Sequence, residues 1–199
     1  MDPGGPTNGL RYGEAEFRRI RELAGGPFEV PEDIRRVLDG LGYMADWRDD
    51  YRVQSVSSSL QAAKITCIDS AILAYGLLEL LFTGVKRRLL AIHRLDPVSG
   101  EECGHCVALH WNDAGKVGSF AKSNYPGLGH RDAVFADEFA IAASYAEAYL
   151  KMGFQPLYFG VTTLEEVAPD VDWRYATESL NVLSERIQTS YAYSFLPQR

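Results

Sequence analysis

The 199-residue sequence lacks the features expected for nucleic-acid binding, membrane insertion or a secreted disulfide framework. Its 27 acidic and 20 basic residues give a net charge of −7, whereas nucleic-acid binding needs a basic face. No apolar run is long enough to cross a bilayer, and the first residues lack the basic and apolar segments of a signal peptide. The three cysteines are an odd number, which does not suit a disulfide framework. These absences predict a reduced, cytoplasmic protein.

The length and the apolar fraction of 46% predict one domain, residues 1–199, that buries a core without disulfides or metals. Within it we expect a flexible Gly/Pro arm over 1–12 and helices over 13–50. A core that carries the candidate catalytic residues is expected over 60–160, and a helix and tail over 170–199.

Hydrophobic periodicity predicts an α+β fold. Residues 66–84 are the longest stretch with helical apolar spacing, and Gly84 ends it, so we expect a central core helix there. The period then changes, and residues 87–96, 105–113 and 116–123 are predicted strands of an antiparallel meander. The remaining expected elements are helices at 14–25, 31–43, 136–153 and 171–188, a strand at 155–161 and a polar connection at 46–61.

The string Cys103-Gly104-His105-Cys106 matches a redox CxxC motif in composition. A redox cysteine of this type opens a helix, where the helix dipole lowers its pKa, but here a strand-like segment follows. Zinc binding would need a second ligand pair, and none has suitable spacing. The sequence therefore favours a role for His105 without its two flanking cysteines.

His105 begins a predicted strand in which Val107, Leu109 and Trp111 share its face. This is the more apolar face, so we expect it to meet the core helix. A buried histidine that donates to a carbonyl is the simpler alternative. Other residues of the chain decide between these two interpretations.

Cys67 is the candidate nucleophile. Thr66 and Asp69 fit the capping pattern of a helix N-terminus, which places Cys67 in the first helical turn. Free backbone N–H groups there favour a thiolate and could stabilise an oxyanion. The alternative is a cysteine that packs as a small apolar side chain.

Asp96 is the first candidate for orienting His105. If the strands that contain Asp96 and His105 form a hairpin, the two side chains would face each other across its loop. Asp96 could instead start a turn, as Asp-Pro often does. Asp113 and Asn124 are the rival orienting residues.

The segments "TCIDSAILAYGLLELL", "GHCVALHW" and "GKVGSFAKSNYPGLGHRD" resemble the transglutaminase-like cysteine enzymes over residues 60–160. Those enzymes usually carry their acid at the end of the strand after the histidine, where this chain has Ala121 and Lys122. The order Cys67, Asp96, His105 is similar to that of the bacterial Dieckmann cyclases, which release tetramic acids and pyridones from carrier proteins. That resemblance implies a catalytic triad of these three residues and no metal or diffusible cofactor.

The same resemblance implies an acyl or peptidyl carrier protein of a polyketide or nonribosomal peptide assembly line as partner. Carrier proteins are usually acidic, so Lys86, Arg87 and Arg88 form a candidate docking patch, with a solvated surface as the alternative. Gln61 and Asn124 are candidates for oxyanion or substrate binding. A transglutaminase-like amidase, peptidase or acyltransferase and a degenerate binding module remain the alternative functions.

Overall fold

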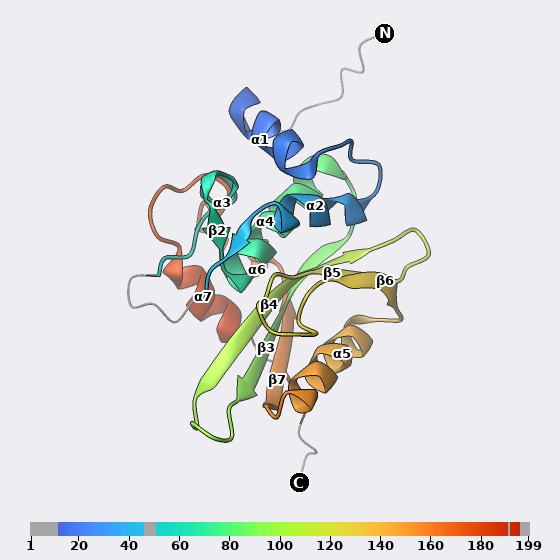
Figure 1. Ribbon diagram of the computed structural model, residues 1–199, viewed down its shortest axis with the longest axis vertical. Helices are drawn as coiled ribbons and strands as arrows, with labels where there is room; N and C mark the ends of the chain where they lie inside the picture. The colour runs from blue at the N-terminus through green and yellow to red at the C-terminus, as the bar shows by residue number, and fades with distance from the viewer. Residues whose placement is uncertain (1–11, 46–50, 191, 196–199) are drawn as a thin grey trace.

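The computed structural model describes residues 12–45, 51–190 and 192–195, which form an α+β fold (Figure 1). Its main sheet is antiparallel throughout and has the strand order β6-β5-β4-β3-β7-β8. The strands are β3 (Arg87–Leu95), β4 (Glu102–Trp111), β5 (Val117–Phe120), β6 (Arg131–Phe135), β7 (Gln155–Thr162) and β8 (Tyr193–Ser194). A small parallel sheet pairs β1 (Gly42–Tyr43) with β2 (Lys64–Ile65).

Helices cover both faces of the main sheet. One face packs against the layer built around α4 (Cys67–Leu81), and the other packs against α5 (Glu138–Lys151). The α4 layer also contains α1 (Glu14–Ala24), a 3₁₀ turn (Pro31–Asp33), α2 (Ile34–Asp39), α3 (Val56–Gln61), α6 (Leu164–Val167) and α7 (Asn181–Gln188). Among the described residues, no helix has the length and apolar character needed to cross a membrane.

The meander β3-β4-β5 and the core helix α4 confirm the sequence predictions. Two other expectations were wrong. The last helix was expected from residue 171 but begins only at Asn181, because the segment before it forms turns. The connection expected at residues 46–61 contains the helix α3, which Ser55 caps. The expected arm is described only at its last residue, and residues 46–50 and 196–199 also lie outside the described part.

The face of β4 that carries His105 packs against α5, which corrects the expectation that it meets the core helix. Val107 and Leu109 belong to the cluster around α5, whereas Cys106 and Ala108 belong to the cluster around α4. Both faces of β4 are buried, so apolar character alone did not identify the helix on each side. Apart from His110, the smaller side chains of β4 lie on the α4 side.

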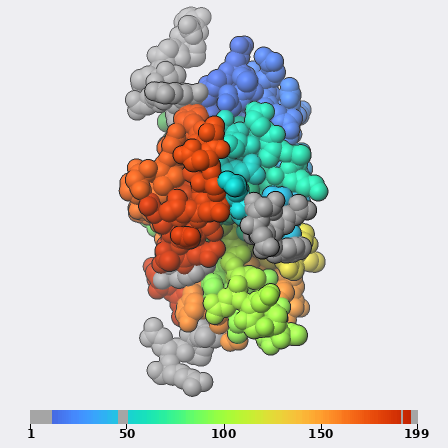
Figure 2. All heavy atoms as spheres, turned by 90° about the vertical axis from the view of Figure 1, so that its left-hand side faces the viewer, coloured from blue at the N-terminus to red at the C-terminus, as the bar shows by residue number. Residues whose placement is uncertain are grey.

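The C-terminal segment closes the flank of the α4 layer. Figure 2 shows this orange and red segment lying against the blue and cyan N-terminal helices. Backbone N–H groups of Val56 and Ser57 donate to the carbonyls of Trp173 and Arg174, and Leu180 N–H donates to the Val53 carbonyl. These bonds fix the segment beside α3, and α7 then reaches the start of α4.

Candidate active site

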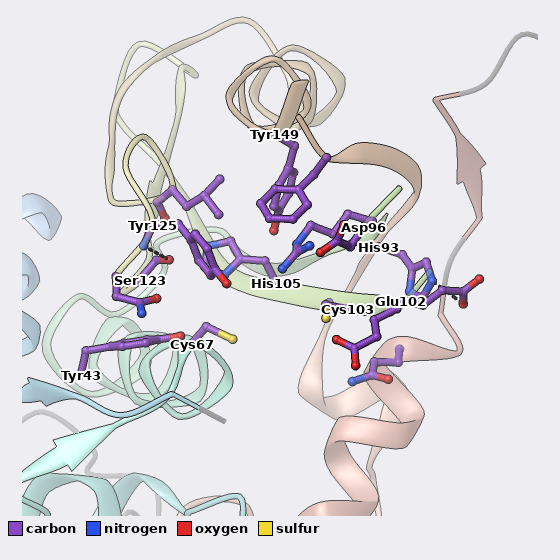
Figure 3. A pocket seen from close by; sticks show the side chains of 17 residues that line it. Tyr43, Cys67, His93, Asp96, Glu102, Cys103, His105, Ser123, Tyr125 and Tyr149 are labelled. Carbon is purple, nitrogen blue, oxygen red and sulfur yellow. Dashed lines mark hydrogen bonds and ion pairs between the residues drawn. The ribbon is translucent and has the colours of Figure 1, made fainter. Parts of the chain in front are cut away.

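A cavity of about 360 Å³ lies beside the β3–β4 hairpin, between residues of that hairpin and residues of α4, α5 and α7 (Figure 3). Cys67 borders it from the start of α4, and His105 and Arg94 border it from the sheet. Tyr149 points into it from α5, and Asn124 lies in the loop after β5. A second cavity of about 160 Å³ adjoins the first, since Cys67, Gly104 and His105 line both.

Local sequence fixes Cys67 at the first position of α4. The Thr66 hydroxyl accepts from Asp69 N–H at 3.3 Å, and the Asp69 carboxylate accepts from Thr66 N–H at 3.0 Å, which confirms the predicted cap. Cys67 is only 5% exposed but borders both cavities. Its thiol therefore lies beside the backbone N–H groups of the helix start and within reach of a bound ligand.

Asp69 is a buried acid that holds this turn in place. Its carboxylate also accepts from Gln54 N–H at 2.8 Å and from the Tyr51 hydroxyl at 3.0 Å. Burial raises the pKa of Asp69, while the hydrogen bonds act in the opposite direction. The donors around the carboxylate explain how an acid is accommodated so close to the cysteine.

His105 is held in one tautomer by a backbone carbonyl. Its Nε2 lies 3.1 Å from the Leu128 carbonyl oxygen, which can only accept, so Nε2 carries the proton and Nδ1 keeps its lone pair. Tyr145 packs edge-on against the ring at 5.8 Å. Burial lowers the pKa of His105 to about 4, and the charges of Arg131 and Arg94 act in the same direction. The imidazole is thus neutral at neutral pH and has one free acceptor nitrogen.

Asp96 does not face His105, which corrects the proposed hairpin contact. His105 pairs with Ile92, and the ladder continues to Leu95 and Glu102 before the turn begins. Asp96 is therefore four residues beyond the partner of His105, or about 13 Å along the strand. Figure 3 places it beside His93, away from Cys67.

The Asp96 carboxylate instead accepts from the N–H groups of Val98 and Ser99, at 2.9 and 3.3 Å. The bond from Val98 is the main cause that lowers its pKa. The turn-forming alternative describes this geometry, although Asp96 does border the larger cavity. The backbone carbonyl of Leu128 holds the His105 ring in place, which is the role that we had expected of an acid.

The two cysteines beside His105 lie on opposite faces of β4. Cys106 is buried on the α4 side, and burial raises the pKa of its thiol to about 12. Cys103 is half-buried and borders the cavity. Positions three apart on a strand point in opposite directions, so this pair does not form a redox CxxC site. Among the described residues, no three His, Cys, Asp or Glu side chains are grouped to hold a metal ion.

The remaining predicted residues separate into two groups. Asn124 borders the larger cavity, as a substrate-binding residue would. Gln61, in contrast, is exposed at the end of α3 and borders neither cavity, because it points out of the helical layer that contains Cys67.

The candidate docking patch lies at the opposite end of β3 from the cavity, about 20 Å away along the strand. Lys86 pairs with Glu138, and Arg87 pairs with both Glu79 and Glu165. Arg88 is half-buried near the start of the same strand. The patch is therefore partly neutralised by acids of this chain.

Sequence reasoning missed Arg94, Tyr149 and the carbonyl of Leu128. The sequence does contain a feature that predicts a buried Arg94: on a strand it shares a face with the apolar residues Leu90 and Ile92, so it should point inward. Tyr149 lies on a predicted amphipathic helix, where an inward aromatic is ordinary. A backbone carbonyl in a loop leaves no mark in the sequence.

Neither a family model nor a curated protein matches the chain.

Proposed function

We propose that this chain is a Dieckmann cyclase of the transglutaminase-like cysteine enzymes, which closes a carrier-bound β-ketoacyl-aminoacyl thioester to a tetramic acid or pyridone. One observation carries the proposal: a helix-start cysteine and a neutral histidine with a free acceptor nitrogen border the same cavity. The order of these residues in the chain and the resemblance of the three segments around them support the assignment.

In the first step, the Cys67 sulfur attacks the thioester carbonyl of the substrate. The thiol proton passes to His105 Nδ1, a new C–S bond forms, and the bond to the carrier sulfur breaks. His105 then returns the proton to the departing carrier thiolate. The N–H groups at the start of α4 face the oxyanion that forms during this step. The acyl group is now attached to Cys67.

In the second step, His105 removes a proton from the methylene between the ketone and the amide carbonyl. The resulting carbanion attacks the acyl carbon on Cys67, so that a C–C bond forms and the C–S bond breaks. The proton on His105 passes to the Cys67 sulfur, which restores both residues. Holding the two ends of the chain close together in one cavity favours ring closure.

The lining of the cavity is compatible with an acyl chain. Tyr43, Tyr125, Tyr149 and Phe154 contribute aromatic surface. Burial raises the pKa of Tyr149, so its hydroxyl stays protonated and can donate to a substrate oxygen. The triad of the initial prediction is thereby replaced by Cys67 and His105, with the Leu128 carbonyl as the orienting group.

The test uses a small N-(β-ketoacyl)-aminoacyl thioester, with wild type, Cys67→Ala and Cys103→Ala compared by mass spectrometry. We expect cyclised product from wild type and Cys103→Ala, and none above background from Cys67→Ala. Cys103→Ala is the matched control, because Cys103 borders the same cavity without lying at a helix start. Hydrolysed acid without cyclised product would instead identify an amidase or peptidase. The absence of both product and protein-bound acyl group would refute an enzymatic role for Cys67.

A further inference from the structure

Arg94 is a buried cation without a carboxylate partner among the described residues. Its side chain lies on the sheet face that carries His105 and is 7% exposed, and its Nη1 has no hydrogen-bond partner in the part of the chain that the structure describes. Arg174, by comparison, packs on Trp173 at 3.7 Å but also pairs with Glu79 at 2.8 Å. A buried guanidinium is costly unless an anion or acceptors satisfy it, so Arg94 needs an explanation.

Aromatic rings hold the Arg94 guanidinium in place. It lies 3.7 Å from the ring centroid of Phe154 and 5.6 Å from those of Tyr125 and Tyr149. Such rings and a hydrogen bond to the Tyr149 hydroxyl stabilise the cation and fix its position, while Nη1 is left as an available donor. The side chain therefore has a defined position and an unused donor.

The position of Arg94 relates it directly to His105. Ile92 pairs with His105 across the ladder, and Arg94 is two residues further along the same face. Such diagonal neighbours have Cα atoms about 7–8 Å apart. Both residues border the larger cavity together with Cys67. One small ligand could therefore contact the base, the nucleophile and the cation at once.

We propose that Arg94 binds the enolate oxygen of a 1,3-dicarbonyl substrate as His105 removes the methylene proton. This inference rests on the proposed cyclase function. A buried neutral imidazole is a weak base, so deprotonation needs stabilisation of the carbanion that it leaves. A fixed guanidinium at the oxygen where negative charge collects would supply it. The same contact would hold the anionic cyclised product before release.

The first arm of the test measures binding without any reaction. A 3-acetyl tetramic acid, which is an anionic 1,3-dicarbonyl at neutral pH, and its neutral O-methyl ether are titrated by calorimetry. We expect wild type to bind the anion at least about tenfold more tightly than the ether, as a charge-assisted hydrogen bond implies. Arg94→Gln should reduce this preference below twofold, and Arg94→Lys should give an intermediate value. Arg174→Gln is the matched control and should keep the wild-type preference.

A preference for the anion that survives in Arg94→Gln, or is absent from wild type, would overturn the inference. Arg94→Lys keeps the charge, and circular dichroism of each variant identifies loss of fold. The second arm measures cyclisation of the thioester substrate. Cyclisation at the same rate by wild type and folded Arg94→Gln would refute the role of Arg94 and leave the cyclase function standing. Arg94-dependent binding of the anion without cyclisation by wild type would refute the cyclase and keep the anion site.

Discussion

The fold should lose stability between pH 6.5 and pH 5 because two histidines are buried in neutral form. His110 is completely buried in the α4 layer and stacks on Phe120 at 4.5 Å, and neither ring nitrogen has a hydrogen-bond partner among the described residues. Burial lowers its pKa to about 4, and the charge of Arg35 acts in the same direction. His105 has a pKa of about 4 for the reasons given above.

The sign and size of the effect follow from the difference in bound protons. In the unfolded chain each histidine titrates near pH 6.5, so below this pH the unfolded state binds protons that the folded state excludes. For a folded-state pKa of about 4, each histidine lowers the free energy of unfolding by roughly 1.5 kcal/mol between pH 6.5 and pH 5. The two together contribute about 3 kcal/mol. The raised pKa of Asp69 acts in the opposite direction, because the folded state then takes up a proton as the pH falls.

Urea unfolding at pH 6.5 and pH 5 tests this account through the variant His110→Leu. Leucine removes the two unpaired nitrogens, so the variant should be at least as stable as wild type at pH 6.5. It should lose about half as much free energy of unfolding on acidification, roughly 1.5 kcal/mol less than wild type. An equal loss in the two proteins would show that His110 does not titrate as its burial predicts.

Four further predictions concern the site and its surroundings. Asp96→Ala should keep kcat/KM for a thioester substrate within about twofold, because Asp96 bonds only to its own turn; a drop of a hundredfold would restore it to the triad. Asp69→Ala should lower the free energy of unfolding by roughly 3 kcal/mol in urea titrations, since several buried donors lose their acceptor. Gly104→Val should leave the melting temperature nearly unchanged but lower kcat/KM at least about tenfold, because the added side chain enters both cavities; unchanged kinetics would exclude this route. Charge reversal at Lys86 and Arg88 should raise the apparent KM for carrier-bound substrate and not for a small thioester, and equal effects on the two substrates would disprove docking there.

The sequence predicted the parts of the fold that depend on local rules. The Thr66–Asp69 cap involves neighbours in the chain, so it could be located along with the first turn of α4. The alternation of β4 and its turn-flanked neighbours was enough to predict the meander. The predicted start of the final helix was wrong because the segment before Asn181 makes backbone hydrogen bonds to α3, which is distant in the sequence.

Sequence analysis could identify those residues of the candidate site whose position depends on local sequence. It missed the contacts that depend on the pairing register of β3 and β4. Cys67 and His105 could be found separately, but the length of the β3–β4 ladder decides which residue faces His105. Had the turn begun three or four residues earlier, Asp96 would lie near the histidine. Leu128 could not be predicted, because its contribution is a carbonyl and depends on the course of a loop.

The candidate nucleophile and the candidate base border one cavity from opposite faces of the sheet, and Gly104 lies beside both. His105 points toward α5, whereas Cys67 lies at the start of the helix on the other face. Gly104 precedes His105 and lines both cavities together with Cys67. On a strand, any side chain at Gly104 would point to the α4 face, the face on which Cys67 lies. We therefore expect the glycine of the CxxC string to bear on the proposed function more directly than its two cysteines, because a side chain there would enter the cavities that the thiol and the imidazole share.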